Sequence, residues 1–121
     1  MLIDSNIVIY SVLPEHAFLD AWLDRADTSF SVITQIEVLG FSQLTDAQRE
    51  RFEELFGVAA TLPLDDAVTQ ACIRLRRARR MKLGDAIIAA TALVHDLPLV
   101  TRNVEDFVDI PGLQVVNPFV A

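Results

Sequence analysis

Four acidic residues stand at positions where a layered α/β fold would bring them together. Asp4 directly follows a short apolar run, and Glu37 lies about one turn into the helical stretch after a second such run. Asp106, with Asn103 before it, follows a later apolar run, and Asp85 opens the apolar helical stretch that leads into that run. Polar residues that follow the strands of an open parallel sheet gather at its carboxyl edge, where such folds bind ligands. The spacing therefore predicts one catalytic set of carboxylates at this edge: Asp4, Glu37, Asp85 and Asp106.

Carboxylates gathered in a partly dry crevice favour the binding of a divalent cation. Like charges at close range raise one another's pKa values unless a cation neutralises them. Mg²⁺ prefers carboxylate oxygens and keeps several of its waters, which leaves room for the phosphate oxygens of a substrate. One or two such ions can orient and deprotonate a water for in-line attack on phosphorus. We therefore expect metal-assisted hydrolysis of a phosphodiester.

Each of these polar residues also has a structural interpretation. Thr34 and Glu37 have the spacing of a capping box, in which the glutamate bonds back to the helix start. Asn103 could cap a short helix, and Asp85 could cap the apolar one. Asp4 has the weakest structural explanation, because a single aspartate at the end of a buried strand contributes little to the stability of the fold. The functional interpretation depends on the joint placement and not on any one residue.

The elements that must position these residues alternate between short apolar runs and longer helical periods. Strands are predicted at residues 1–4, 28–33, 58–64, 97–101 and 113–116. Helices are predicted from residue 5 to 13, where Pro14 interrupts, and at 17–25, 34–44, 45–56, from a cap at Asp65 or Asp66, at 86–95 and at 103–107. Strands that alternate with helices imply right-handed crossovers. We expect an α/β fold, a three-layer α/β/α sandwich around a mainly parallel sheet of four to five strands, with residues 1–121 as a single domain.

The composition is that of a globular domain in a reducing compartment. The chain has 121 residues, of which 52% are hydrophobic and 22% are charged, and no apolar run is long enough to span a bilayer. No signal peptide is visible after Met1, and Cys72 is a single cysteine on the apolar face of its predicted helix, where we expect it in the core. We expect a cytoplasmic protein. His16 and His95 have no nucleophile in a recognisable setting, and the four glycines form no phosphate-binding loop.

The charge of the chain is unevenly distributed. The net charge is −7, which by itself disfavours nucleic acid as a partner. However, six of the ten Lys and Arg residues fall within residues 74–82, which we call the basic segment: Arg74, Arg76, Arg77, Arg79, Arg80 and Lys82. Such a segment can hold a phosphate backbone locally, or it can be a solvated helix face. We expect Arg77, Arg80 and Lys82 to contact the phosphate backbone of a nucleic acid.

One predicted helix is apolar on every side. Between residues 86 and 94 only Thr91 is polar. A helix without a polar face is buried on more than one side. We expect it to lie between the sheet and another layer, or partly at a dimer interface.

Four segments of the chain resemble the acidic motifs of PIN domains. The segments are residues 2–6, 33–38, 82–91 and 101–107, with the sequences LIDSN, ITQIEV, KLGDAIIAAT and TRNVEDF. Their order, spacing and flanking apolar residues are most similar to those of VapC-type toxins. The resemblance extends over nearly the whole chain, as far as the terminal Val-Asn-Pro.

This resemblance implies a metal-dependent endoribonuclease, the toxic component of a toxin–antitoxin module. It implies that Asp4 and Asp85 are the principal ligands of Mg²⁺, for which Mn²⁺ could substitute. Glu37 would bind a metal or its water, and Asp106 would complete the acidic set. The implied partners are an RNA substrate, a cognate antitoxin that covers the acidic site, and a second copy of the chain in a homodimer, with no membrane.

Three further polar residues complete the implied site. Asn6, Thr101 and Asn103 would orient the carboxylates by hydrogen bonds. Asn103 stands where many family members have Asp and others have Asn, and it cannot supply a negative charge. This departure weakens the expectation of a second firmly bound ion.

Two other functions remain as alternatives. A receiver-type signalling domain shares the layering and an acidic pocket, but it needs adjacent acids after the first strand and a Lys after a late strand, where this chain has Asp4 alone and Arg102. A catalytically inactive PIN-like binding subunit would keep the fold without the chemistry, and Asn103 is the feature that favours it.

Overall fold

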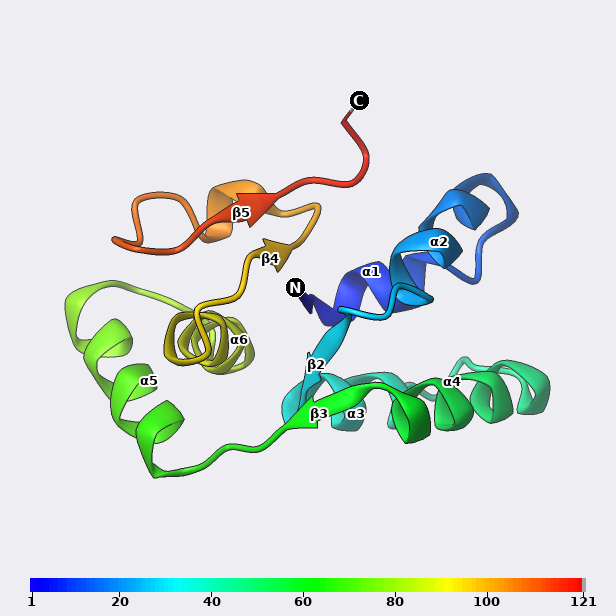
Figure 1. Ribbon diagram of the computed structural model, residues 1–121, viewed down its shortest axis with the longest axis horizontal. Coiled ribbons are helices and arrows are strands. Elements are labelled where there is room, and N and C mark those ends of the chain that lie inside the picture. Colours follow the sequence, from blue (N-terminus) through cyan, green and yellow to red (C-terminus); the bar gives the residue numbers. More distant parts are fainter. Residues whose placement is uncertain (121) are drawn as a thin grey trace.

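The computed structural model describes residues 1–120, which are arranged around one sheet of five strands (Figure 1). The strands are β1 (Leu2–Ile3), β2 (Ser29–Ser31), β3 (Ala60–Leu62), β4 (Leu99–Val100) and β5 (Val115–Val116). Their order is β3-β2-β1-β4-β5, and every neighbouring pair is parallel. The predicted parallel α/β sheet is therefore confirmed, with strands shorter than expected.

Helices connect consecutive strands and cover both faces of the sheet. They are α1 (Ser5–Tyr10), η1 (Pro14–Leu19), α2 (Asp20–Leu23), α3 (Val32–Leu39), α4 (Asp46–Val58), α5 (Asp66–Ala78), α6 (Leu83–Val94) and η2 (Val104–Asp106). In Figure 1, α5 and α6 lie on one side of the strands, and α1 to α4 lie on the other. This arrangement confirms the predicted three layers.

The two faces of the sheet bury separate cores. Leu2 and Leu99 pack with α5 and α6, whereas Ile3 and Val100 pack with residues of α1, α2, α3 and α4. Successive side chains of a strand point to opposite faces, so each two-residue strand contributes to both cores. The strands are apolar at both positions because neither face meets water.

The α6 helix is the buried helix that the sequence predicts. All residues from 86 to 92 are buried, and four of them are alanines, whose small side chains allow close approach of the neighbouring elements. The helix packs mainly against α5, where Cys72 is buried in the same core cluster, as expected. Among residues 1–120, no helix combines the length and apolar character required to cross a membrane.

The start of α3 differs from the prediction, and the difference matters for the site. The helix begins at Val32 and not at Thr34, because Ser31 is the cap: its side chain accepts the backbone N–H of Ile33 at 3.2 Å. The capping box proposed for Thr34 and Glu37 is therefore wrong. Glu37 lies in the second turn, whereas the free backbone N–H groups of a helix lie in its first turn. Its carboxylate is therefore available for contacts other than capping.

Four other helix boundaries can be compared with the prediction. The capping box of α4 is present at Thr45 and Gln48, and Asp65 caps α5 as expected. The α4 helix continues to Val58, where a strand was predicted to begin. Pro14 begins the helical turn η1 instead of only interrupting a helix, because proline is well tolerated at a first helical position.

Candidate active site

The predicted acidic residues come from four elements that meet at the carboxyl edge of the sheet. Asp4 directly follows β1, and Glu37 lies on α3, which follows β2 without a break. Asp106 ends η2, which follows β4. Asp85 lies in the first turn of α6, the helix that leads into β4. The right-handed connections of a parallel sheet place all of these positions on one side.

Asp4 is the buried member of the set. Only 3% of its surface is exposed, and its Oδ2 atom accepts a hydrogen bond of 2.8 Å from the Thr101 hydroxyl. The backbone N–H of Asn103 donates in turn to the Thr101 hydroxyl oxygen at 3.1 Å. Thr101 thus fixes the carboxylate and connects β1 to the chain after β4.

The environment of Asp4 disfavours its negative charge. Burial raises the pKa of its carboxyl to about 6, the bond from Thr101 opposes the rise, and the charges of Asp85 and Glu37 add to it. The carboxylate is therefore held in a place that an isolated anion would avoid. A cation at this place would remove the penalty.

Glu37 is held by a residue that the sequence analysis did not single out. The Ser5 hydroxyl donates to Glu37 Oε1 at 2.7 Å and lies 3.1 Å from Thr34 Oγ1. Ser5 and Thr34 are buried, while the Glu37 residue is exposed. A Cβ atom added to Gly84 would lie 3.5 Å from Glu37 Oε2, so the carboxylate lies beside the first turn of α6.

Asp85 lines a pocket at the surface together with Asp106 and Glu105. Burial raises the pKa of its carboxyl, and so do the charges of Asp106 and Glu37, while Lys82 lowers it. Lys82 occupies the cap position of α6, so the interpretation of Asp85 as that cap is wrong. The pocket has a volume of about 400 Å³ and is lined by Arg80, Met81, Lys82, Asp85, Glu105 and Asp106.

The carboxylates are close enough to raise one another's pKa values. They do not, however, converge on a single point as the ligands of a bound ion would. Within residues 1–120, no three acidic, histidine or cysteine side chains are grouped as a metal-binding cluster. Mg²⁺ does not need such a cage, because it commonly binds through one or two carboxylates, waters and substrate phosphates. The donor set of hard oxygen atoms around the buried Asp4 fits an ion of this kind.

The structure separates the other predicted site residues into two groups. Thr101 contacts Asp4, and Arg80 and Lys82 line the pocket with Asp85. Asn6 is exposed and, within the described chain, donates no hydrogen bond to these carboxylates. Asn103 contributes its backbone N–H, while its side chain does not cap η2. Arg77 lies outside this pocket.

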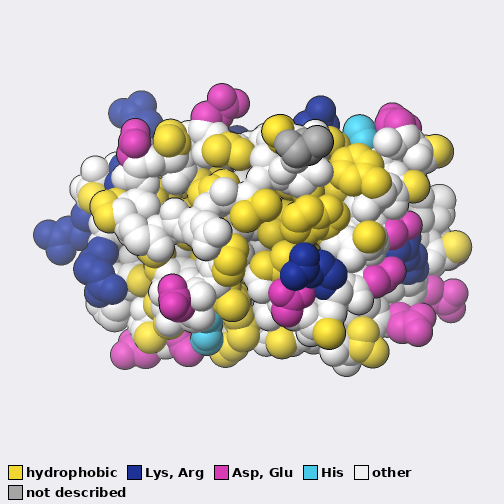
Figure 2. Space-filling model, turned by 45° about the horizontal axis from the view of Figure 1, so that its top comes forward, with side chains coloured by type: hydrophobic (Ala, Val, Ile, Leu, Met, Phe, Trp, Pro, Cys, Tyr) yellow, Lys and Arg dark blue, Asp and Glu magenta, His cyan; other side chains and the backbone are white. Residues whose placement is uncertain are grey.

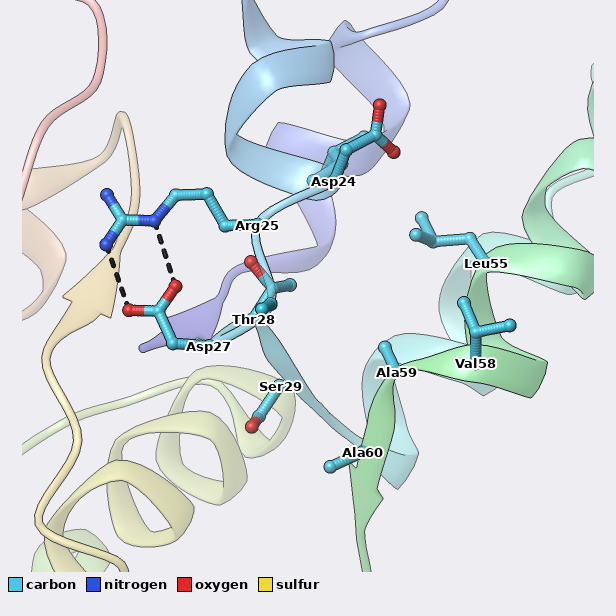
Figure 3. A pocket seen from close by; sticks show the side chains of 11 residues that line it. Asp24, Arg25, Asp27, Thr28, Ser29, Leu55, Val58, Ala59 and Ala60 are labelled. Atoms are coloured by element: carbon cyan, nitrogen blue, oxygen red, sulfur yellow. Dashed lines mark hydrogen bonds and ion pairs between the residues drawn. The ribbon is translucent and has the colours of Figure 1, made fainter.

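A larger hollow lies at the opposite edge of the sheet (Figure 3). Its volume is about 460 Å³, and Ser29 and Ala60, which begin β2 and β3, contribute to its lining. Arg25 and Asp27 pair on one side of it through two hydrogen bonds of 2.9 Å, and Leu55 lies on the other side. The four acids at the carboxyl edge have no part in this hollow.

Comparison with known proteins identifies the family of this α/β domain. The chain matches the PIN domain family over residues 1–113. It is 32% identical over 102 residues to Ribonuclease VapC5 from Mycobacterium tuberculosis (strain ATCC 25618 / H37Rv), a match that covers 78% of this chain and 75% of the relative.

Solved structures show the same relationship. A chain of a toxin–antitoxin complex from Klebsiella pneumoniae is 35% identical with a TM-score of 0.78, and the match covers 98% of this chain and 97% of that chain. A chain of FitAcB from Neisseria gonorrhoeae is 26% identical with a TM-score of 0.75, and the match covers 99% of both chains.

The parallel sheet with acids at its carboxyl edge is thus a PIN-type architecture, and the chain belongs to the PIN domain family. Within that family it is of the VapC type. The resemblance seen in the four sequence motifs is confirmed.

Proposed function

We propose that the chain is a Mg²⁺-dependent endoribonuclease that hydrolyses RNA phosphodiester bonds as the toxic component of a toxin–antitoxin module. The observation that carries the proposal is the buried Asp4 carboxylate, whose charge is disfavoured by burial and by Asp85 and Glu37. A site that concentrates negative charge in a desolvated place is suited to a divalent ion. Its VapC-type relatives, among them a protein named as a ribonuclease, support RNA as the substrate.

The proposed mechanism assigns a task to each residue of the site. Asp4 and Asp85 would hold Mg²⁺, or Mn²⁺ as a substitute, and Thr101 orients the Asp4 carboxylate through its bond of 2.8 Å. When bound, the ion would acidify a water and stabilise the charge that develops at the phosphorus. Glu37, held by Ser5, would orient that water or bind the ion directly, and Asp106 would complete the acidic set.

The proposed partners follow from the relatives and from the surface around the site. The similar chain from Klebsiella pneumoniae belongs to a toxin–antitoxin complex, which supports a cognate antitoxin for this chain. A homodimer is supported by two large apolar side chains beside the acids: Ile36 on α3 is 62% exposed and Leu83 on α6 is 55% exposed. We propose that the protein acts in the cytoplasm.

A second candidate is a catalytically inactive PIN-like binding subunit. Two observations favour it. Asn103 supplies no negative charge to the site, and the carboxylates do not close around one point within the described residues. The two candidates differ in their response to metal.

Metal removal tests the proposed function directly. Purified protein should cleave single-stranded or structured RNA with Mg²⁺ or Mn²⁺, should lose this activity in excess chelator, and should recover it when metal is restored. Gel analysis of end-labelled RNA measures the cleavage. Full activity in excess chelator would contradict the proposal, and absence of both cleavage and Mn²⁺ binding would favour the inactive subunit.

Removal of the Ser5 hydroxyl tests how Glu37 is positioned. Ser5→Ala is expected to reduce Mn²⁺ affinity or cleavage by about 10- to 100-fold, the range seen when a ligand's hydrogen-bond partner is removed. The reason is that Glu37 would lose its 2.7 Å bond from Ser5. Affinity can be measured by Mn²⁺ titration of thermal unfolding, independently of turnover.

Two control variants distinguish positioning from general damage. Ser5→Thr keeps a hydroxyl and is expected to retain most of the affinity. Ser11→Ala removes another buried hydroxyl, which donates a hydrogen bond of 2.6 Å to the Val8 carbonyl and does not contact the acids. This variant should leave metal affinity unchanged. Equal effects of Ser5→Ala and Ser11→Ala would contradict a positioning role.

A further inference from the structure

The basic segment (residues 74–82) takes part in no ion pair within the described residues. Within residues 1–120 the ion pairs are Arg25 with Asp27 and Arg51 with Asp20, and neither involves this segment. The chain has 17 acidic residues, so the absence of pairing is not caused by a shortage of anions. In Figure 2, Lys and Arg side chains gather at the left end of the molecule, where Figure 1 shows the end of α5 and its connection to α6.

Arg79 differs from the rest of the basic segment because its guanidinium is used to hold the fold. It donates to the carbonyl of Asp109 at 2.9 Å and to that of Val108 at 3.4 Å. Its Nε atom is buried and, within the described residues, has no hydrogen-bond partner. Arg79 thus ties the α5–α6 connection to the chain that follows η2.

A separate hollow lies at the end of α5, where Arg76, Arg77 and Arg80 come together with Arg79. It has a volume of about 410 Å³ and is lined by Arg76, Arg77, Ala78, Arg79, Arg80 and Met81. Arg80 and Met81 also line the acidic pocket that contains Asp85. The two hollows are therefore adjacent and share Arg80 and Met81. The hydrogen bonds from Arg79 to the chain after η2 fix the position of this segment.

We propose that this hollow is a second phosphate subsite, which binds a phosphodiester of the RNA strand beyond the one that is cleaved. Arg76, Arg77 and Arg80 supply the charge, and guanidinium groups match phosphate oxygens in geometry. Part of this charge faces the carbonyl end of α5, but a helix end carries only about half an elementary charge. The excess of positive charge is available to a ligand.

This inference rests on the proposed function and adds to it a preference for RNA substrates above a minimum length. With its metal bound, the acidic pocket alone would accept any phosphodiester that reaches it. A neighbouring cationic subsite adds binding energy only when the substrate is long enough to occupy both. An acidic protein can thereby hold a polyanion, with affinity that does not depend on base sequence and that falls with salt.

The test compares an oligonucleotide with a dinucleotide. Fluorescence anisotropy is measured in chelator, so that no RNA is cut, with a labelled 12-nucleotide single-stranded RNA and a labelled dinucleotide at several KCl concentrations. Arg76→Gln with Arg77→Gln is expected to weaken binding of the 12-mer by about 2- to 30-fold at low salt, as expected for two exposed ion pairs. The salt slope should fall by about 0.7 for each phosphate that the variant no longer neutralises. The dinucleotide has a single phosphodiester and can make only one such contact, so it should bind more weakly than the 12-mer to the unchanged protein and lose less affinity in the double variant.

Arg74→Gln is the matched control. Arg74 is exposed on the same helix but lines a different hollow, beside Leu75 and Leu93. Its neutralisation changes the net charge without touching the proposed subsite. A second control combines Arg74→Gln with Arg51→Gln, which removes the same number of charges elsewhere. If this control weakens 12-mer binding as much as the double variant does, the effect is one of overall charge and the subsite proposal is overturned.

The outcome separates this inference from the proposed function. Salt-dependent binding that needs Arg76 and Arg77, without any metal-dependent cleavage, would support the subsite and contradict the nuclease. Metal-dependent cleavage of the 12-mer and the dinucleotide with equal efficiency, unchanged in the double variant, would support the nuclease and overturn the subsite.

Discussion

Asp4→Asn and Asp85→Asn are each expected to lower Mg²⁺-stimulated RNA cleavage by more than about 100-fold, since even the hydrogen-bond partners of metal ligands typically change affinity or activity by about 10- to 100-fold. Each variant removes one negative charge from the place where burial and neighbouring acids disfavour it. The shapes of the side chains are nearly unchanged, and the amide oxygen introduced by Asp4→Asn could still accept the bond from Thr101. Initial cleavage rates of end-labelled RNA measure the effect.

Asp24→Asn is the control for the loss of a carboxylate. Asp24 is exposed at the opposite edge of the sheet and takes no part in the acidic pocket. Its replacement should leave cleavage within about twofold of the unchanged protein, as for surface substitutions away from a site. Wild-type rates for Asp4→Asn, in protein that is folded by circular dichroism, would remove the basis of the nuclease proposal.

The metal-free protein is expected to become less stable as the pH rises from about 4 to about 6. The pKa of Asp4 rises from 3.8 to about 6 on folding, because of burial first and of Asp85 and Glu37 in addition. Between these values the folded state binds more protons than the unfolded state, so stability falls with increasing pH. The full effect corresponds to about 3 kcal/mol. Urea unfolding in chelator at intervals of pH measures it.

Asp4→Asn isolates this contribution from those of the other carboxylates. The variant should be more stable than the unchanged protein at pH 7, and the difference should shrink as the pH falls towards 4, where the folded protein holds Asp4 protonated. Divalent metal at 100 times its dissociation constant should stabilise the unchanged protein by about 2.7 kcal/mol but have little effect on the variant. A difference that is constant with pH would contradict the origin of the effect in Asp4.

The fold was largely predictable because it depends on patterns that are local in the chain. Short apolar runs separated by helical periods specify a parallel sheet, and the caps at Thr45 and Asp65 follow from residue types within one turn. The boundary at Ser31 was less predictable. Ser31 and Thr34 both have side chains that can cap a helix, and the choice depends on where β2 stops pairing with its neighbours.

The meeting of the four acids at one edge follows from the order of residues along the chain, because the carboxyl ends of parallel strands lie on the same side whatever the details of packing. The task of each side chain at that edge depends instead on contacts between distant segments. The Thr101 bond to Asp4 joins residues 97 positions apart, the Ser5 bond to Glu37 spans 32 positions, and the tie from Arg79 to Asp109 spans 30. Such contacts depend on how α1, α3 and the chain after β4 pack together, and no short sequence pattern encodes that packing. For the same reason Arg79 and Arg77, which look alike in the basic segment, differ in the folded protein: one is a structural tie, and the other remains exposed.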